Sequence, residues 1–180
     1  MDKKQILERL KKSLARTTAC FRWDRKKLST SYGKGKWTAR EVLAHLSDSE
    51  LVFLTRLRFM LAEENPGVAP WDADRWASKF AYGKADLAEL RDTYALMRKT
   101  FMRLFKAADE QDLAKTGRHP EYPNYTVNIL AQYMLRHNEH HLEQLDAIKS
   151  GRTWSPSGEY AAWRASMQSS ASSRAPVPAK

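Results

Sequence analysis

Hydrophobic and polar positions along this chain repeat with a helical period. Four segments carry apolar residues at spacings of three and four, as amphipathic helices do. The pattern predicts long helices over residues 2–21, 38–64, 84–108 and 126–149, and a shorter helix near residues 159–168. Glycine and proline are scarce, seven of each, and many lie between these segments or in the tail, so the chain has fewer turn signals than a sheet protein needs.

The second predicted helix has the clearest start signal in the sequence. Thr38 and Glu41 are spaced as a capping box, in which each side chain bonds a backbone N–H near the other residue. Trp37 and Val42 flank the box at the spacing of a hydrophobic staple. The run at residues 65–67, Asn-Pro-Gly, is expected to end this helix.

Four amphipathic helices favour an all-α, four-helix bundle. The joint between the second and third helices is long, and residues 68–83 are rich in aromatic side chains. It is therefore expected to be a packed crossover along the bundle, and simple up-and-down order is not required. We expect one domain over residues 1–168, followed by a disordered tail over residues 169–180, which are poor in hydrophobic side chains.

Composition narrows the function classes. Hydrophobic residues make up 42% of the chain, which is typical of a globular protein. The net charge is +10, from 31 Lys and Arg against 21 Asp and Glu. Since the basic residues, Arg56 and Arg98 among them, are scattered rather than gathered in a stripe, we interpret them as a solvated surface and do not expect nucleic-acid binding.

The single cysteine and the absence of long apolar runs bear on location. Cys20 has no second cysteine to pair with, and we interpret it as a small buried apolar residue. No apolar run resembles a signal peptide or is long enough to span a membrane. We therefore expect a cytoplasmic protein without a membrane-spanning segment.

Histidines provide the strongest chemical signal. Three of the five lie in the last long helix, at positions 137, 140 and 141. At about 100° per residue, His137 and His141 lie about 40° apart inside the apolar stripe, while His140 lies about 100° from His141, on the flank. Two core imidazoles one turn apart can bind one metal ion, so we interpret His137 and His141 as ligands and His140 as a flank or supporting residue.

A third ligand is expected from another helix. His45 lies two turns into the second helix, at the edge of its apolar face, and is the candidate. Three histidines without a fourth protein ligand leave a coordination position open, as catalytic sites do. His119, which precedes Pro120, could line the mouth of the site or cap a turn, and we favour the turn.

Other chemical patterns are weak. No Ser-His-Asp order and no glycine-rich phosphate loop stand out. Four acidic residues lie near the histidines, and we interpret all of them as solvated helix charges: Asp48, Glu50, Glu139 and Glu143. No residue is identified as catalytic.

Several of these motifs resemble a known family. Residues 37–50 resemble the second-helix signature of the DinB/YfiT-like superfamily, and residues 137–144 resemble its last-helix signature. Residues 72–77 and 117–122 are similar to one branch of that superfamily. The resemblance covers about residues 5–150, and three short motifs in the right order are fairly specific.

The resemblance implies a fold, a site and a range of activities. It implies a four-helix bundle with a long crossover between the second and third helices, and a site of His45, His137 and His141 that holds Ni or Zn. Homodimers are common among relatives. Pro123 and Asn124 depart from the family pattern, in which similar members often carry glycine after the tyrosine, and this concerns the loop.

Activity is the least defined implication. Some relatives resemble thiol-dependent S-transferases, with a low-molecular-weight thiol as a partner, and many are described as metal-dependent hydrolases acting on small molecules. The alternative is a non-catalytic, stress-associated protein in which the metal links the second and fourth helices. A polar pocket beside the site favours catalysis, and a sealed site favours the structural alternative.

Overall fold

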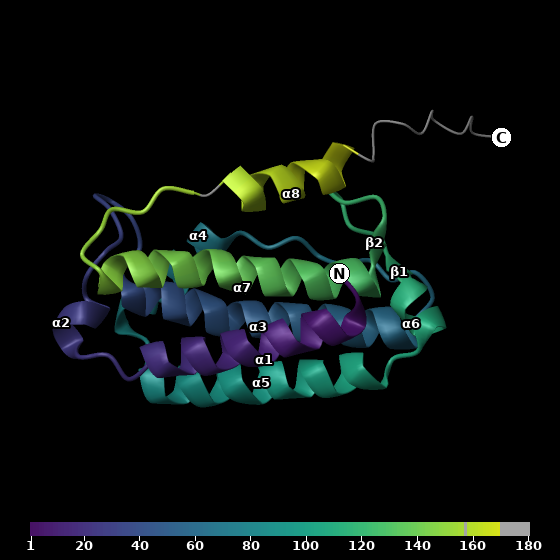
Figure 1. The fold of residues 1–180 in the computed structure, drawn as a ribbon, viewed down its shortest axis with the longest axis horizontal. Coiled ribbons are helices and arrows are strands. Elements are labelled where there is room, and N and C mark those ends of the chain that lie inside the picture. The colour runs from purple at the N-terminus through teal and green to yellow at the C-terminus, as the bar shows by residue number, and fades with distance from the viewer. Residues whose placement is uncertain (157, 170–180) are drawn as a thin grey trace.

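Four long helices form the body of the molecule, as the sequence predicted (Figure 1). The computed structural model describes residues 1–156 and 158–169. The long helices are α1 (Lys3–Cys20), α3 (Ala39–Ala62), α5 (Leu87–Ala107) and α7 (Val127–Lys149). The all-α four-helix bundle is therefore confirmed.

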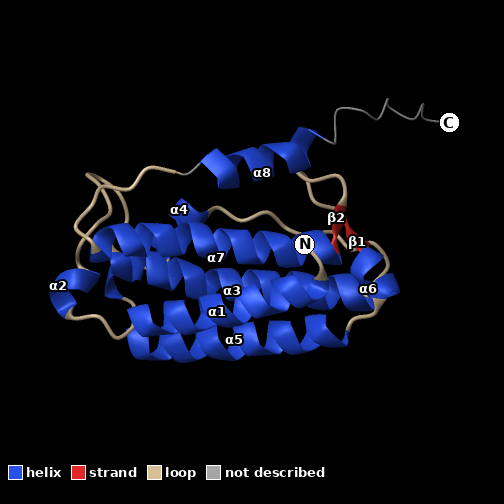
Figure 2. Ribbon diagram, viewed as in Figure 1, coloured by secondary structure: helices blue, strands red, loops and turns tan. Residues whose placement is uncertain are grey.

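Short elements connect the long helices (Figure 2). These are the helices α2 (Arg25–Leu28), α4 (Ala73–Lys79), η1 (Tyr82–Lys84) and α6 (Glu110–Ala114), and the strands β1 (Thr116–Gly117) and β2 (Tyr125–Thr126). The two strands pair antiparallel and close the loop before α7. Sequence periodicity missed these elements because one or two turns are too short to show a period.

The C-terminal part of the described chain is α8 (Gly158–Ser169), close to the short helix that the sequence predicted. It lies across one side of α7, away from the other bundle helices (Figure 1). The expected tail begins at Ser169, which is the last residue of α8, and residues 170–180 lie outside the described residues. Within the described ranges, every helix is too short or too polar to cross a membrane.

Helices α3 and α5 run in the same direction, so the bundle is not a simple up-and-down one. Arg40 near the start of α3 bonds the Ala85 carbonyl just before α5, and Glu50 further along α3 pairs with Arg98 further along α5. The crossover, which carries α4, makes this possible because it returns the chain along the bundle. The long crossover is therefore confirmed.

The crossover is less buried than expected. Tyr82 is buried, and Trp71 and Trp76 are half-buried, but Phe80 is 57% exposed. The aromatic side chains nevertheless stack along the segment, with ring centroids 5.0 Å apart for Trp71 and Trp76 and 5.6 Å apart for Trp76 and Phe80. The segment is therefore ordered partly by its own aromatic contacts.

Helices α1 and α7 form the second parallel pair. Arg9 pairs with Glu139, and one to two turns further along both helices Arg16 pairs with Asp146. Glu139, which the sequence suggested to be merely solvated, is half-buried in one of these pairs. Each parallel pair lies antiparallel to the other, and His45 of α3 consequently meets the middle of α7.

The capping box at the start of α3 is present, and it fixes the register of this helix. The Thr38 hydroxyl accepts the Glu41 backbone N–H at 3.3 Å, and the Glu41 carboxylate accepts the Thr38 N–H at 2.8 Å. His45 follows seven residues after this fixed start, two turns into the helix. Local sequence therefore sets the place of one of the three site histidines.

A buried ion pair crosses the middle of the bundle and corrects two expectations. Glu50 is 1% exposed and Arg98 is fully buried, although both were interpreted as solvated charges. Arg98 donates through two nitrogens to Glu50 and through a third to the Ser13 hydroxyl at 2.9 Å. Two hydrophobic clusters occupy the two halves of the bundle, and this layer joins α1, α3 and α5 between them.

Cys20 is buried and unbridged, in agreement with its interpretation as a small core residue. Burial raises the pKa of its thiol to about 11, with Asp146 as the second cause. A thiol with so high a pKa is protonated at neutral pH and is a poor nucleophile or metal ligand.

The first prediction concerns the buried ion pair. Arg98→Met leaves the Glu50 carboxylate buried without its cation, which is expected to lower the free energy of unfolding by about 3–5 kcal/mol. The double variant Arg98→Met/Glu50→Leu is expected to lose less, because no charge stays unpaired. Urea unfolding followed by circular dichroism measures both, with the exposed Arg103→Met as control. A double variant as unstable as Arg98→Met would contradict this account.

Candidate metal centre

Three imidazoles from two helices meet at one point in the bundle. The Nε2 atom of His137 lies 3.0 Å from Nε2 of His45 and 3.2 Å from Nε2 of His141. His45 comes from α3 and the other two from α7, 92 residues further along the chain. The structure thus brings together the three histidines that the sequence selected.

All three rings are almost fully enclosed. His45 is 2% exposed, His137 9% and His141 7%. His137 and His141 lie one turn apart on α7, and α3 passes antiparallel to α7 at this level, which brings His45 opposite them. Burying three imidazoles is costly unless their ring nitrogens find partners.

The Gln144 side chain defines the protonation of one ring. Its carbonyl oxygen lies 2.8 Å from Nδ1 of His141, so Nδ1 carries the proton and donates it. Nε2 of His141 therefore presents a lone pair toward His137. Gln144 is 3% exposed, and its short contact holds the His141 ring in place, as supporting residues do at metal sites.

Three Nε2 atoms at these separations suit a metal ion better than they suit one another. A single Nε2–H of His137 can donate to one neighbour only, which leaves the other close contact without a hydrogen. Three nitrogens at 2.0–2.1 Å from a tetrahedral ion lie about 3.3 Å apart. The separations of 3.0 and 3.2 Å are close to that value, so the residues present fit a divalent ion.

Aromatic side chains hold the third ring. The Trp71 ring stacks on His45 with centroids 5.1 Å apart and an interplanar angle of 7°, and the Trp37 ring lies 4.9 Å away on a tilt. The Nδ1 atom of His45 is buried without a hydrogen-bond partner. On its Nδ1 side, therefore, packing rather than hydrogen bonding holds this imidazole.

Burial keeps the three imidazoles neutral. It lowers the pKa of His141 to about 3 and, with smaller Coulombic effects from neighbouring histidines, lowers the pKa of His45 and His137 well below the usual value. Neutral imidazole is the form that binds a metal. The site is therefore ready to bind an ion at neutral pH without first losing protons.

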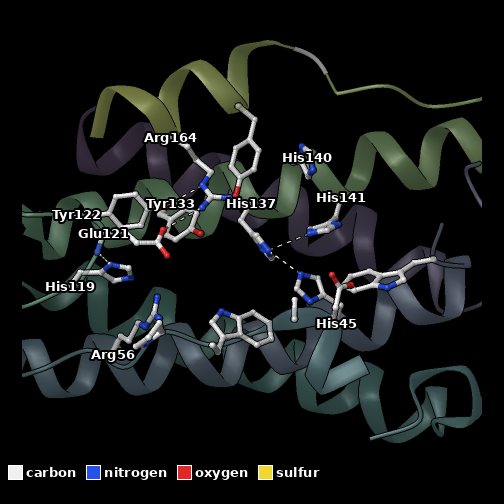
Figure 3. A pocket seen from close by; sticks show the side chains of 16 residues that line it. His45, Arg56, His119, Glu121, Tyr122, Tyr133, His137, His140, His141 and Arg164 are labelled. Carbon is white, nitrogen blue, oxygen red and sulfur yellow. Dashed lines mark hydrogen bonds and ion pairs between the residues drawn. The ribbon is translucent and has the colours of Figure 1, made fainter. Parts of the chain in front are cut away.

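A cavity of about 290 Å³ opens beside the three histidines. Its lining includes the polar side chains of Arg56, Glu121, Tyr133, Tyr160 and Arg164. Figure 3 shows His45 and His141 toward one end and Arg56 and His119 toward the other, with His137 between them. The site is not sealed, and a small molecule can reach the Nε2 cluster.

His140 lies on the flank of α7, off the face that carries His137 and His141, as expected. It is half-buried, lines the cavity, and its ring lies 4.5 Å from the Tyr160 ring of α8 and 4.9 Å from Trp154. Burial, with Arg164 as the second cause, lowers its pKa to about 4.

His119 combines both of the roles that the sequence left open. Its Nδ1 accepts the backbone N–H of Glu121 at 3.1 Å, which caps the turn, and its ring also lines the cavity. It contacts the rings of Tyr122 and Tyr125 at 4.5 and 4.8 Å.

Sequence reasoning missed most of the cavity wall, although some of it follows from helical spacing. Tyr133 precedes His137 by four residues and Gln144 follows His141 by three, so both face the same side of α7. Tyr160 and Arg164 are one turn apart on α8 and both line the cavity. No sequence signal indicates that α8 lies against the site, because the preceding connection has no regular pattern.

Comparisons with known proteins agree with this architecture. The family model described as "DinB superfamily" matches residues 3–145. A protein from Oceanobacillus iheyensis named "Putative metal-dependent hydrolase" is 31% identical over 127 residues, which cover 71% of this chain and 73% of that protein. A protein of the same name from Bacillus mycoides is 27% identical and covers 83% of this chain and 85% of its own length.

A solved structure has the same fold. YfiT from Bacillus subtilis, described as "a probable metal-dependent hydrolase with an unusual four-helix bundle topology", superposes with a TM-score of 0.75 at 24% identity. The match covers 85% of this chain and 89% of that chain. It shows that the bundle with two parallel pairs is a shared topology.

We expect His45, His137 and His141 to be required for metal binding, and His140 not to be required. Replacing His45, His137 or His141 by Ala should abolish binding of one Zn²⁺ or Ni²⁺ per chain, because two imidazoles hold such an ion weakly. His140→Ala is the matched control and should keep full stoichiometry. Equilibrium dialysis with metal analysis measures this, and an equal loss from His140→Ala would show that the assignment of faces on α7 is wrong.

The buried imidazoles also predict how the stability of the metal-free protein depends on pH. Below pH 6.5 the three histidines are protonated in the unfolded chain but stay neutral in the folded state. The free energy of unfolding should therefore fall as pH decreases. For His141 the loss continues down to its folded pKa of about 3. Each fully buried histidine contributes about 1.4 kcal/mol per pH unit.

Urea unfolding of chelated protein between pH 7.5 and 5 measures this slope. His141→Asn removes one of the three groups and should make the slope shallower, by an amount that approaches about 1.4 kcal/mol per pH unit toward pH 5, where the unfolded histidine is almost fully protonated. Stability that stays constant or rises on acidification would contradict the prediction.

Proposed function

This chain belongs to the DinB superfamily, and on that premise we propose that it is a metal-dependent hydrolase whose ion is held by His45, His137 and His141. The observation that carries the proposal is the polar cavity onto which the three converging Nε2 atoms open. A site that served only to link α3 and α7 would not need a cavity of about 290 Å³ beside it.

The donor set suits the chemistry of hydrolysis. A divalent ion with three imidazole ligands and an open position acts as a Lewis acid and makes water nucleophilic near neutral pH. Three nitrogen ligands are compatible with Zn²⁺ or Ni²⁺, which are the ions we propose. The protein contributes neutral ligands, a defined opening and the side chains that face the substrate.

Hydrogen-bond donors line the wall opposite the crossover. Burial raises the pKa of Tyr160, so its hydroxyl is protonated at neutral pH. Arg164 donates from Nε to the Tyr122 hydroxyl at 3.0 Å and faces the cavity. Donors of this kind stabilise negative charge that develops on a substrate oxygen during hydrolysis.

The remaining wall limits the entry of water. Trp71 stacks on His45, and Trp37 lies at 6.5 Å from His141 with nearly parallel rings, so indoles cover two of the three imidazoles. His140 lines the cavity as a neutral ring, and its Nδ1 is buried without a hydrogen-bond partner.

The proposed function predicts turnover that depends on the metal and on its ligands. Chelated protein should hydrolyse none of a panel of small ester and amide substrates, and adding one equivalent of Zn²⁺ or Ni²⁺ should restore activity. His137→Ala should lower kcat/KM at least a hundredfold, because the ion leaves with its ligand. Chromogenic release or mass spectrometry measures the products.

Two further outcomes discriminate between the function classes. Turnover that requires an added low-molecular-weight thiol, with the thiol found in the product, would indicate an S-transferase in place of a hydrolase. Stoichiometric metal binding that raises the melting temperature without any turnover would favour the structural, non-catalytic alternative. For such an ion, a hundredfold excess over Kd adds about 2.7 kcal/mol to the free energy of unfolding.

A further inference from the structure

Arg56 lies on the same face of α3 as His45. The two residues are eleven positions apart, which is about 20° around a helix and about 16 Å along it. Side chains on a helix lean toward its N-terminus, so the long Arg56 side chain points back toward His45. Both side chains line one cavity, with Arg56 near the end opposite the metal-facing histidines (Figure 3).

The guanidinium of Arg56 is buried without a carboxylate partner. The residue is 5% exposed, and its bonds are to the Ala69 carbonyl at 2.5 Å and the Tyr125 hydroxyl at 3.4 Å. Its Nε is buried and has no hydrogen-bond partner. Among the residues that the structure describes, no acidic side chain lies within ion-pair distance of it.

Two other arginines of the described residues lie beside carboxylates, whereas half-buried Arg136 lies over the Trp163 ring. Arg98 pairs with Glu50 in the core, and Arg164 lies 3.5 Å from the Glu121 carboxylate at the cavity wall. A buried cation without an anion is expensive, so its retention in a ligand-accessible cavity needs a reason. The positive charge of Arg56 affects a neighbouring residue. Burial is the first cause that lowers the pKa of His119 to about 4, and the charge of Arg56 is the second.

We propose that Arg56 binds an anionic group, a carboxylate or a phosphate, on the small molecule whose reactive bond lies beside the three histidines. The position of the reactive bond rests on the proposed hydrolase function, whereas anion binding at Arg56 does not. Planar guanidinium groups bind such oxyanions through paired N–H bonds, and the free Nε–H supplies one of them. Tyr122 and Arg164 lie across the same end of the cavity, where Arg164 is already paired with Glu121, so Arg56 is the cation left for an anionic group.

The arrangement gives the cavity two chemically different ends. At one end, the neutral imidazoles of His45, His137 and His141 surround the proposed metal position. At the other end lies the guanidinium of Arg56, which has no carboxylate partner. A substrate with an anionic group several bonds away from its scissile bond would span both. A cavity of about 290 Å³ restricts such a substrate to a small molecule.

Anion binding by the metal-free, full-length protein tests the proposal. Inorganic phosphate and succinate are titrated separately by calorimetry, and the two arms distinguish phosphate from carboxylate recognition. At least one of them should bind the wild type, and Arg56→Gln should weaken that binding at least tenfold, because a hydrogen-bonded charge is lost. Arg56→Lys should give an intermediate loss, since it keeps the charge without the planar fork.

Arg58→Gln is the matched control, because it removes the same charge from an exposed position on the same helix. Its affinity for the anion should equal that of the wild type. An equal loss from both variants would show that only net charge matters and would overturn the proposal, as would the absence of binding of either anion to the wild type.

A second measurement does not depend on a folded variant. In the wild type, the ¹⁵N-labelled Nε–H signal of Arg56, assigned through its neighbours Ala69 and Tyr125, should shift and become protected from solvent exchange as the anion is added. An unmoved signal during saturable binding would place the anion elsewhere and overturn the proposal. Since no metal is present, these results stand apart from the test of hydrolysis, which can fail without affecting them.

Discussion

The convergence of three imidazole lone pairs is the constraint around which this bundle is arranged. Nε2 atoms 3.0 and 3.2 Å apart cannot all hydrogen-bond one another, and this supports the divalent ion that we propose between them. Only the antiparallel crossing of α3 and α7 brings His45 to this place. That crossing in turn requires the long return segment that makes α3 and α5 parallel.

The parts of the fold that depend on local patterns could be predicted from the sequence. Apolar periodicity located the four long helices, the Thr38–Glu41 capping box set the start of α3, and the spacing of His137 and His141 identified the site. These signals are contained within a few turns of chain. They therefore do not depend on knowing which segment packs against which.

The parts that were missed depend on partners that are distant in sequence. Glu50 looked like a solvated charge because the residue that neutralises it, Arg98, is 48 positions away, and nothing periodic connects them. Arg56 was counted with the surface arginines because nothing local shows that it is buried against Ala69 and Tyr125. Tyr160 and Arg164 could not be placed because α8 packs through tertiary contacts alone. Charge by itself is a poor guide to burial when long-range pairing can compensate it.

The two parallel helix pairs also have a consequence for how the chain acquires its structure. Arg9 and Glu139 are 130 residues apart, and Arg98 meets Ser13 across 85 residues. During synthesis α1 emerges first, yet its two neighbours, α5 and α7, are completed only when most of the chain exists. Such non-local contacts slow folding, and the apolar face of α1 stays uncovered for the longest time. The same topology that assembles the histidines therefore delays the burial of the apolar face of α1.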